Sequence, residues 1–149
     1  MKHLGQIGQI VFAMLLASIH AHAQGNLDGI WKGKTSQGRE FVVAVKGGAV
    51  SSIKLGFSLK LDSPCAMPGT PIAVDYRGGE AETTFGKPVM IAQGSFSVTS
   101  GLHDVDAKIS GKFSGDTVKG AIELQASANS GCSGKDVLTW SATRAALTK

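Results

Sequence analysis

The 149-residue chain has little of what enzymes use for catalysis. It contains two cysteines, only 6% of its residues are aromatic, and His103 is the one histidine beyond residue 23. A nucleophilic serine needs a constrained turn beside a base, and no Gly-x-Ser-x-Gly elbow occurs. Zinc takes four ligands at recognisable spacings, and neither Cys-x-x-Cys nor His-x-x-x-His occurs. The sequence therefore predicts no catalytic residues, no metal site and no cofactor.

The charged residues give no sign of a nucleic-acid-binding surface. Lys and Arg number 15 against 11 Asp and Glu, a formal net charge of +4. Nucleic-acid-binding proteins concentrate such charges in a stripe or cluster, whereas here they are scattered singly along the chain. We therefore expect no nucleic-acid partner.

Residues 1–23 have the pattern of a cleavable export signal. Met1–His3 is a short basic start, Ile7–Ile19 is largely apolar, and Ala21–Ala23 has the small-x-small pattern that precedes cleavage. The alternative, a membrane anchor, needs about 20 consecutive apolar residues, and no second apolar run follows. We expect residues 24–149 to form one soluble domain in the periplasm or outside the cell, with no membrane span after cleavage.

Cys65 and Cys132 are predicted to form a disulfide, because an even number of cysteines in an exported chain is typically paired. The alternative is a metal site of both thiolates and His103, which would still lack a fourth ligand. Closing a loop of about 67 residues would stabilise the fold by roughly 4 kcal/mol.

Hydrophobic and polar residues alternate along most of the chain, and no segment has a convincing helical period. This alternation predicts antiparallel strands with one buried face. The expected strands cover 29–35, 41–45, 53–61, 72–76, 89–98, 108–113, 118–125 and 138–143, of which 89–98 is bent or divided in two. Leu61–Pro71 and Arg77–Pro88 are predicted to be long loops, the first rich in proline and the second rich in glycine.

The segments on either side of Ser114–Thr117 predict a hairpin with a four-residue loop. Pairing Phe113 with Val118 places Ile109 opposite Ile122 in the core. A slip of one residue would reverse the faces of one strand, so the core fixes this register.

The same register places Gly111 opposite Gly120, which leaves a notch without side chains. A large ring usually covers such a notch. Trp31 and Trp140 are the candidates, and both are expected in the core.

Short strands joined by glycine-rich connections indicate a barrel, with a β-sandwich as the alternative. In an up-and-down barrel successive loops alternate between the two ends, and bridged Cα atoms lie within about 7 Å of each other. If 89–98 counts as one strand, Cys65 and Cys132 fall at the same end. The predicted fold is therefore all-β, a single antiparallel barrel of about eight strands with one disulfide. This argument does not apply to a Greek-key sandwich, which remains an alternative fold.

Gly29-Ile30-Trp31 on the first strand resembles the Gly-x-Trp opening of calycin-type barrels, which include lipocalins, avidin-like proteins and small periplasmic protease inhibitors. The resemblance implies an eight-stranded barrel with Trp31 plugging one end and a small molecule or a protein bound at the other. No later lipocalin motif and no biotin site is matched, so no binding residue is carried over. Ile109–Phe113 and Val137–Ala142 resemble segments of small secreted bacterial β-domains of unknown function, which implies the same fold and compartment.

Three groups of residues could carry chemistry, but each fits a structural role better. His103 with Asp104 or Asp106 could belong to a serine triad, and the two aspartates could hold calcium, which takes six to eight oxygen ligands. Glu80 and Glu82 could act as a carboxylate pair in glycoside hydrolysis, yet a flexible loop would fix them poorly. The core needs most of the aromatic residues that could line a ligand cavity, namely Trp31, Phe57, Tyr76 and Trp140.

The sequence does not identify a function. The best-supported interpretation is a non-enzymatic exported binding or inhibitor module, since rigid β-scaffolds carry recognition on their loops. Its partner would be an unknown protein or small-molecule ligand, contacted through Leu61–Pro71 and Arg77–Pro88. The alternatives are a structural or surface protein without a specific ligand, and a hydrolase that uses His103.

Overall fold

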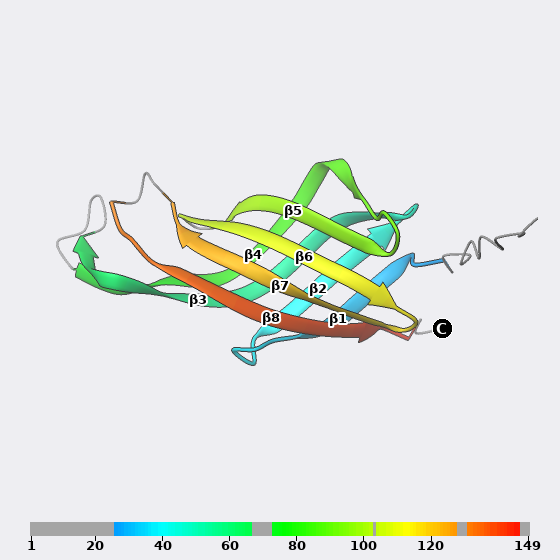
Figure 1. Ribbon diagram of the computed structural model, residues 1–149, viewed down its shortest axis with the longest axis horizontal. Helices are drawn as coiled ribbons and strands as arrows, with labels where there is room; N and C mark the ends of the chain where they lie inside the picture. The colour runs from blue at the N-terminus through cyan, green and yellow to red at the C-terminus, as the bar shows by residue number, and fades with distance from the viewer. Residues whose placement is uncertain (1–25, 67–72, 103, 128–130, 147–149) are drawn as a thin grey trace, which may run out of the picture.

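The computed structural model describes residues 26–66, 73–102, 104–127 and 131–146, which form an all-β fold (Figure 1). The expected export signal, residues 1–23, and His103 lie outside the described residues. In chain order the strands are β1 (Gly29–Thr35), β2 (Glu40–Lys46), β3 (Ala49–Ala66), β4 (Ala73–Met90), β5 (Ser95–Leu102), β6 (Val105–Ser114), β7 (Thr117–Ala126) and β8 (Lys135–Arg144).

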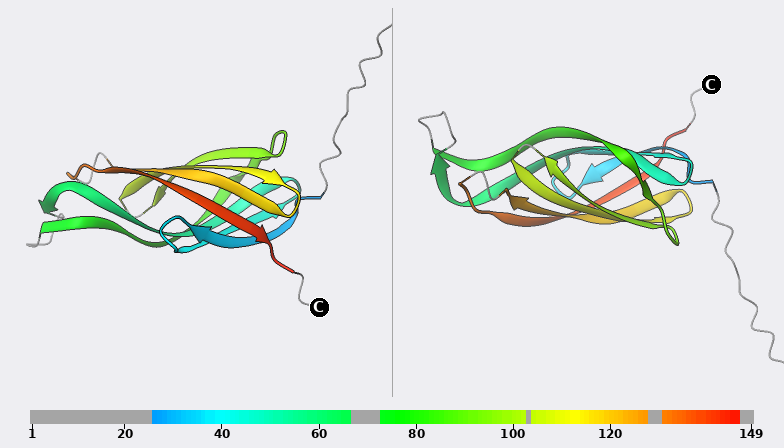
Figure 2. Two further views of the ribbon diagram at one scale, coloured as in Figure 1. Left: turned by 60° about the horizontal axis from the view of Figure 1, so that its bottom comes forward. Right: turned by 90° about the horizontal axis from the view of Figure 1, so that it is seen from above.

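The strands form one antiparallel sheet in the order β4-β3-β2-β1-β8-β7-β6-β5. This sheet curls into a nearly closed barrel, in which β1 pairs with β8 over Trp31–Thr35 (Figure 2). The predicted all-β barrel of eight strands is confirmed, and the sandwich alternative is not formed.

The β3–β4 hairpin is longer than predicted, with 18 residues in each strand. The prediction of a loop at Arg77–Pro88 is wrong, because these residues form most of β4. Leu61–Ala66 of the other predicted loop belongs to β3. Gly78 and Gly79 have φ angles of 155° and 151°, which only glycine adopts readily. A Cβ atom on Gly78 would lie 2.4 Å from the Phe57 carbonyl oxygen. The glycines that predicted a loop therefore let β4 bend closely against β3.

Residues 89–98 were also predicted as one bent or divided strand, and in the structure they are divided between β4 and β5. Val89 and Met90 end β4, and β5 begins at Ser95. Between them the chain reverses at Gln93 and Gly94, whose φ angles of 51° and 74° are left-handed. Because Ala73–Tyr76 of the predicted strand 72–76 and Val89 both belong to β4, the number of strands is still eight.

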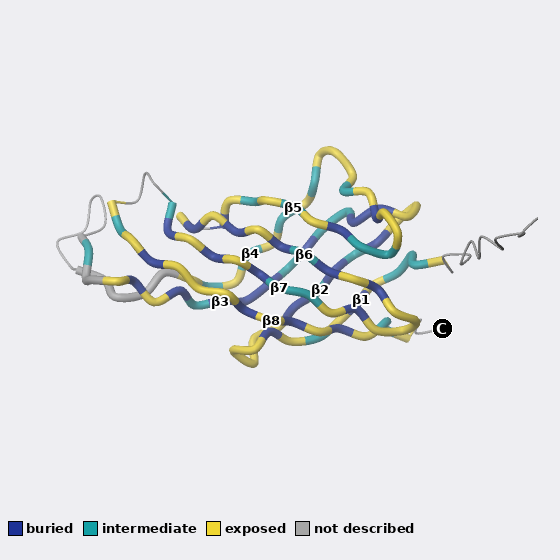
Figure 3. The backbone as a smooth tube through the Cα atoms, viewed as in Figure 1, coloured by how far each residue is buried: buried dark blue, intermediate teal, exposed yellow. Residues whose placement is uncertain are grey.

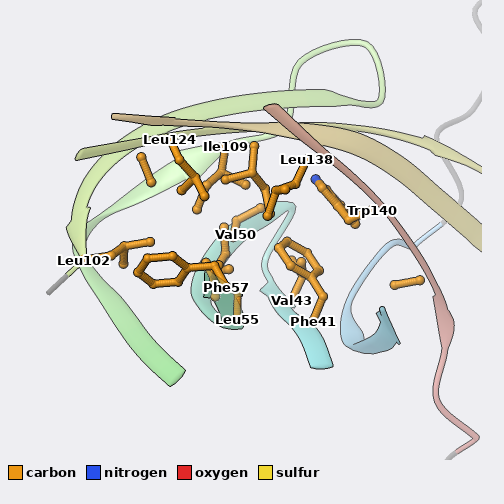
Figure 4. Packing of buried hydrophobic residues seen from close by; sticks show 14 of the residues in the cluster. Phe41, Val43, Val50, Leu55, Phe57, Leu102, Ile109, Leu124, Leu138 and Trp140 are labelled. Atoms are coloured by element: carbon orange, nitrogen blue, oxygen red, sulfur yellow. The ribbon is translucent and has the colours of Figure 1, made fainter. Parts of the chain in front are cut away.

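Buried and exposed residues alternate along most of the strands (Figure 3). Side chains from opposite walls meet in the interior, with Leu124, Ile109 and Leu138 on one side and Val50 and Phe57 on the other (Figure 4). The largest fully buried side chains are those of Trp31, Phe41, Phe57, Ile53, Leu55, Leu59, Ile109, Ile122, Val43, Val50, Val105 and Val118. Their burial drives the sheet to curl, because the apolar face is then removed from water.

Trp140 covers the predicted glycine notch. Gly111 and Gly120 are paired as predicted, and a Cβ atom on Gly111 would lie 2.7 Å from the Trp140 ring. The ring stacks on Phe41 at a centroid distance of 4.0 Å, and its Nε1 donates a hydrogen bond of 3.1 Å to the Ser110 carbonyl oxygen. The two glycines therefore make room for a large ring whose apolar face is stacked and whose N–H is hydrogen-bonded.

One end of the barrel is clamped by the predicted disulfide between Cys65 and Cys132, whose Cα atoms are 5.6 Å apart. The backbone N–H of Asp62 also donates to the Ser133 carbonyl oxygen at 2.9 Å. The projecting end of the β3–β4 hairpin is thus fixed to the connection between β7 and β8.

Trp31 lies toward the opposite end and is fully buried. Its Nε1 donates a hydrogen bond of 3.0 Å to the Leu27 carbonyl oxygen, and the guanidinium carbon of Arg144 lies 4.7 Å from its ring centroid. The Asp28 carboxylate accepts hydrogen bonds from the backbone N–H groups of Gly47 and Gly48. Asn26–Asp28 is therefore tied to this end of the barrel through strand β8 and the β2–β3 turn.

Candidate functional site

The barrel is incomplete where β4 faces β5. These strands stand at the two ends of the sheet order, and within the described ranges no ladder joins them. A bridge between Ala92 and Ser95 marks the turn, and the side-chain oxygens of Thr83 and Ser100 are 3.2 Å apart, within hydrogen-bond distance. We call the facing edges of β4 and β5 the open junction.

A bulge in β4 borders the open junction. Four residues of β4, Phe85–Pro88, stand opposite the single residue Ser51 of β3. Bulges bend the strand that contains them, and Pro88 has no N–H to donate. In Figure 1 the chain between the labels β4 and β5 arches away from the rest of the sheet. The bulge therefore turns the end of β4 away from the edge of β5.

The inward side chains at the open junction are only half-buried. Ala81 and Thr83 lie opposite the buried Leu55 and Ile53 of β3, so they face the interior. Val98 and Ser100 lie opposite inward residues of β6 in the same way. The half-buried lining of the junction consists of Ala81, Thr83, Phe85, Val98 and Ser100. The lining is thus a stretch of interior wall that the fold leaves partly exposed to solvent.

The two edges of the open junction differ in their protection against other strands. Edge strands usually carry charges, proline or bulges that discourage pairing with a further strand. β4 has the exposed Glu80 and Glu82 together with Pro88. β5, with the sequence Ser-Phe-Ser-Val-Thr-Ser-Gly-Leu, contains no charged residue and no proline. Over Ser95–Leu102, β5 therefore presents an unprotected edge.

Negative charge gathers on the outer face of β4. Nζ of Lys54, on β3, lies 3.0 Å from a carboxylate oxygen of Glu40 and 3.9 Å from one of Glu80. The hydrogen bond that Lys54 donates to Glu40 raises the pKa of Lys54, and the charges of Glu40, Glu80 and Glu82 raise it further. Arg39 lies over Gly56 of β3, one strand farther from the junction. Lys54 thus interacts with Glu40 as well as with the carboxylates of β4.

The other predicted site residues are not brought together. Glu80 and Glu82 stand on a paired strand, not on the flexible loop that the sequence predicted. Asp104 lies at the turn between β5 and β6 with a φ of 61°, whereas Asp106 is exposed on β6. Among the residues that the structure describes, no three His, Cys, Asp or Glu side chains cluster as they would around a metal ion.

The aromatic residues belong to the core where their side chains are described. Trp31, Phe57 and Trp140 are buried among other hydrophobic residues. Trp31 contacts Phe113 edge-on at a centroid distance of 4.9 Å. The side chain of Tyr76 lies outside the described part. These rings fill the barrel instead of lining a cavity.

Sequence reasoning missed the lining of the open junction, because most of its side chains are small or polar and give a weak alternating pattern. The signal that could have found the junction is the uncharged run Ser95–Leu102, which follows shortly after Pro88. A β-prone segment without charge or proline is typical of an edge that can pair further.

Comparison of the chain with protein-family models, with curated proteins and with solved structures finds no match in any of the three. In the described part of the chain, no helix has the length and hydropathy needed to cross a membrane.

Proposed function

We propose that this protein is an exported, non-enzymatic binding module that holds a partner protein at the open junction. The observation that carries the proposal is the edge of β5, which within the described ranges has no ladder to β4 and no charged residue, beside a half-buried and partly apolar lining. Such an edge can pair with an extended segment of another protein by strand addition.

The filled interior supports a surface site over a ligand cavity. Phe41 and Trp140 stack across the inside of the barrel, and Phe96 and Phe113 lie 6.0 Å apart, centroid to centroid. A small-molecule carrier needs an apolar space of at least about 300 Å³. The Gly-x-Trp resemblance at Gly29–Trp31 also allows a protein as the bound partner.

The disulfide supports the expected export to the periplasm or the medium. Disulfides persist in oxidising compartments and are rare in the cytosol. The bond between Cys65 and Cys132 would keep the projecting β3–β4 hairpin, and with it one side of the open junction, in a fixed position outside the cytoplasm.

A display selection tests this function. Extended peptides are selected on the immobilised, oxidised protein, and recovered binders are measured against Thr99→Lys and Thr139→Lys. Both residues are exposed threonines on strands, but only Thr99 belongs to the unprotected edge. We expect Thr99→Lys to weaken binding at least about tenfold and Thr139→Lys to leave it unchanged.

Binders that tolerate Thr99→Lys would place recognition elsewhere and refute the proposal. A selection that yields no binder at all would favour the alternative of a structural or surface protein without a specific ligand.

A further inference from the structure

We infer that the open junction accepts one extended strand whose outward side chains are basic and whose inward side chains are apolar. The inference rests on the proposed function and specifies the chemistry of the partner. It follows from the width of the junction, from its inner lining and from the charges on its outer rim.

The junction is narrower than an added strand requires, and a hydrogen bond holds it closed. Neighbouring strands lie about 4.8 Å apart, so a strand between β4 and β5 needs roughly twice this separation. The side chains of Thr83 and Ser100 are short, and their oxygens are 3.2 Å apart. The backbones are therefore closer than two strand spacings, and the incoming strand must separate these two side chains. We call the contact between Thr83 and Ser100 the latch.

The inner lining selects apolar side chains on one face of the incoming strand. Alternate residues of that strand would point between Ala81 and Val98 and toward Phe85, all of which pack against the hydrophobic core. Burying apolar side chains there would remove the half-exposed lining from water.

The outer rim selects basic side chains on the opposite face. Residues paired with Glu80 and Glu82 would lie about 5 Å from them, where opposite charges attract and like charges repel. β5 offers the exposed Ser97 and Thr99 on its side, which carry no charge. Lys87 lies at the bulge, so from Gly78 to Phe85 the charged residues of β4 are the two carboxylates, which lysine or arginine complements better than glutamate.

Two capped octapeptides serve as probes, one alternating valine with lysine and threonine, the other with glutamate in place of lysine. Their binding to the oxidised full chain is measured by fluorescence anisotropy at low salt. We expect the basic peptide to bind about tenfold more tightly than the acidic one. Glu80→Gln with Glu82→Gln should abolish this preference. The control pair Glu123→Gln with Asp136→Asn, at exposed positions of β7 and β8, should retain it.

The latch gives a second measurement. In Thr83→Val with Ser100→Ala, binding no longer has to break a hydrogen bond, so both peptides should bind about fivefold more tightly. Thr83→Ser keeps a hydroxyl group and should bind like the wild type.

The possible outcomes separate the inference from the proposed function. Equal affinity for the two peptides, with both lost in Thr99→Lys, would overturn the charge preference and leave the binding surface in place. If neither Thr99→Lys nor the latch variants change the affinity for the peptides, the open junction is not the binding site and the inference is overturned. A protein that forms dimers disrupted by Thr99→Lys and binds neither peptide would show that a second copy occupies the edge, which also overturns the inference.

Discussion

Two junctions close this barrel in opposite ways. β1 and β8 lie at opposite ends of the described chain, yet five residue pairs from Trp31–Arg144 to Thr35–Trp140 join them in a closed junction. β4 and β5 are consecutive in sequence, yet they meet through the latch and the turn. Proximity along the chain therefore does not decide which strands pair.

The difference lies in how closely the backbones can approach. At the closed junction Gly33 has no side chain where a Cβ atom would lie 1.8 Å from the Ser141 carbonyl oxygen. At the open junction the bulge at Phe85–Pro88 directs β4 away, and Gly101 of β5 has no atom within 4 Å of its Cβ position. Gly33 is thus in close contact at the closed junction, whereas Gly101 is at an exposed position of β5 where a methyl group meets nothing.

The largest expected effect comes from removing the disulfide, which holds the β3–β4 hairpin in the absence of a ladder to β5. Cys65→Ala with Cys132→Ala should lower the free energy of unfolding by about 4 kcal/mol, because the unfolded chain regains the freedom of a long loop. Urea denaturation of the oxidised protein and of the variant measures this loss. Hydrogen exchange should accelerate more at β4 than at the β1–β8 pairs, and equal acceleration at both would contradict the difference between the junctions.

The next largest effect on stability is expected from one of two matched glycine-to-alanine substitutions, one at each junction. Gly33→Ala should destabilise the protein by about 3 kcal/mol, since its new methyl group meets the backbone of β8 and neither strand can move aside freely. Gly101→Ala adds the same methyl group in open space and should change stability by less than about 0.5 kcal/mol. Similar denaturation midpoints for the two variants would show that β1 and β8 are not closely packed.

Much of the closed part of the barrel could be predicted from sequence, for a physical reason. Strands β6 and β7 are buried on one face and exposed on the other, so their alternation fixes their register, although the predicted 108–113 is shorter than β6. The pairings of Ile109 with Ile122 and of Gly111 with Gly120 follow from that alternation, whereas the choice of Trp140 over Trp31 as the covering ring comes from the structure. The disulfide could be predicted because an even number of cysteines in an exported chain is typically paired.

The open junction could not be predicted in the same way. β4 is an edge strand, so Ala81 and Thr83 are only half-buried and give a weak alternating pattern. The glycines at 78 and 79 predict a turn by composition, although here they allow a bend within a strand. Whether β4 and β5 pair depends on contacts between residues that are distant in sequence, and local sequence patterns do not report such contacts.

A smaller effect concerns the end of the closed junction and depends on pH. Hydrogen bonds from Gly47 and Gly48, helped by the charge of Arg144, lower the pKa of Asp28 below its ordinary value of 3.8. The ionised carboxylate therefore stabilises the fold above pH 3.8, and this contribution is lost as the pH falls through the lowered pKa. Asp28→Asn should be less stable than the wild type at pH 7.

The difference between the wild type and Asp28→Asn should then shrink in thermal melts below pH 3.8. A constant difference between the wild type and Asp28→Asn down to pH 2 would refute the role of the ionised carboxylate.

The smallest effect tests whether the latch is the weak point of the barrel. Thr83→Val keeps the shape of the side chain but removes the hydroxyl group, so it should lower the free energy of unfolding by about 1 kcal/mol or less. Thr143→Val, at an exposed position of β8 in the closed junction, should change it by less than about 0.5 kcal/mol. The sharper measurement is amide exchange, which should accelerate along β5 in Thr83→Val at little cost in global stability, because opening there breaks no ladder. If exchange along β5 is as slow in Thr83→Val as in the wild type, contacts other than this hydroxyl pair keep β4 and β5 together.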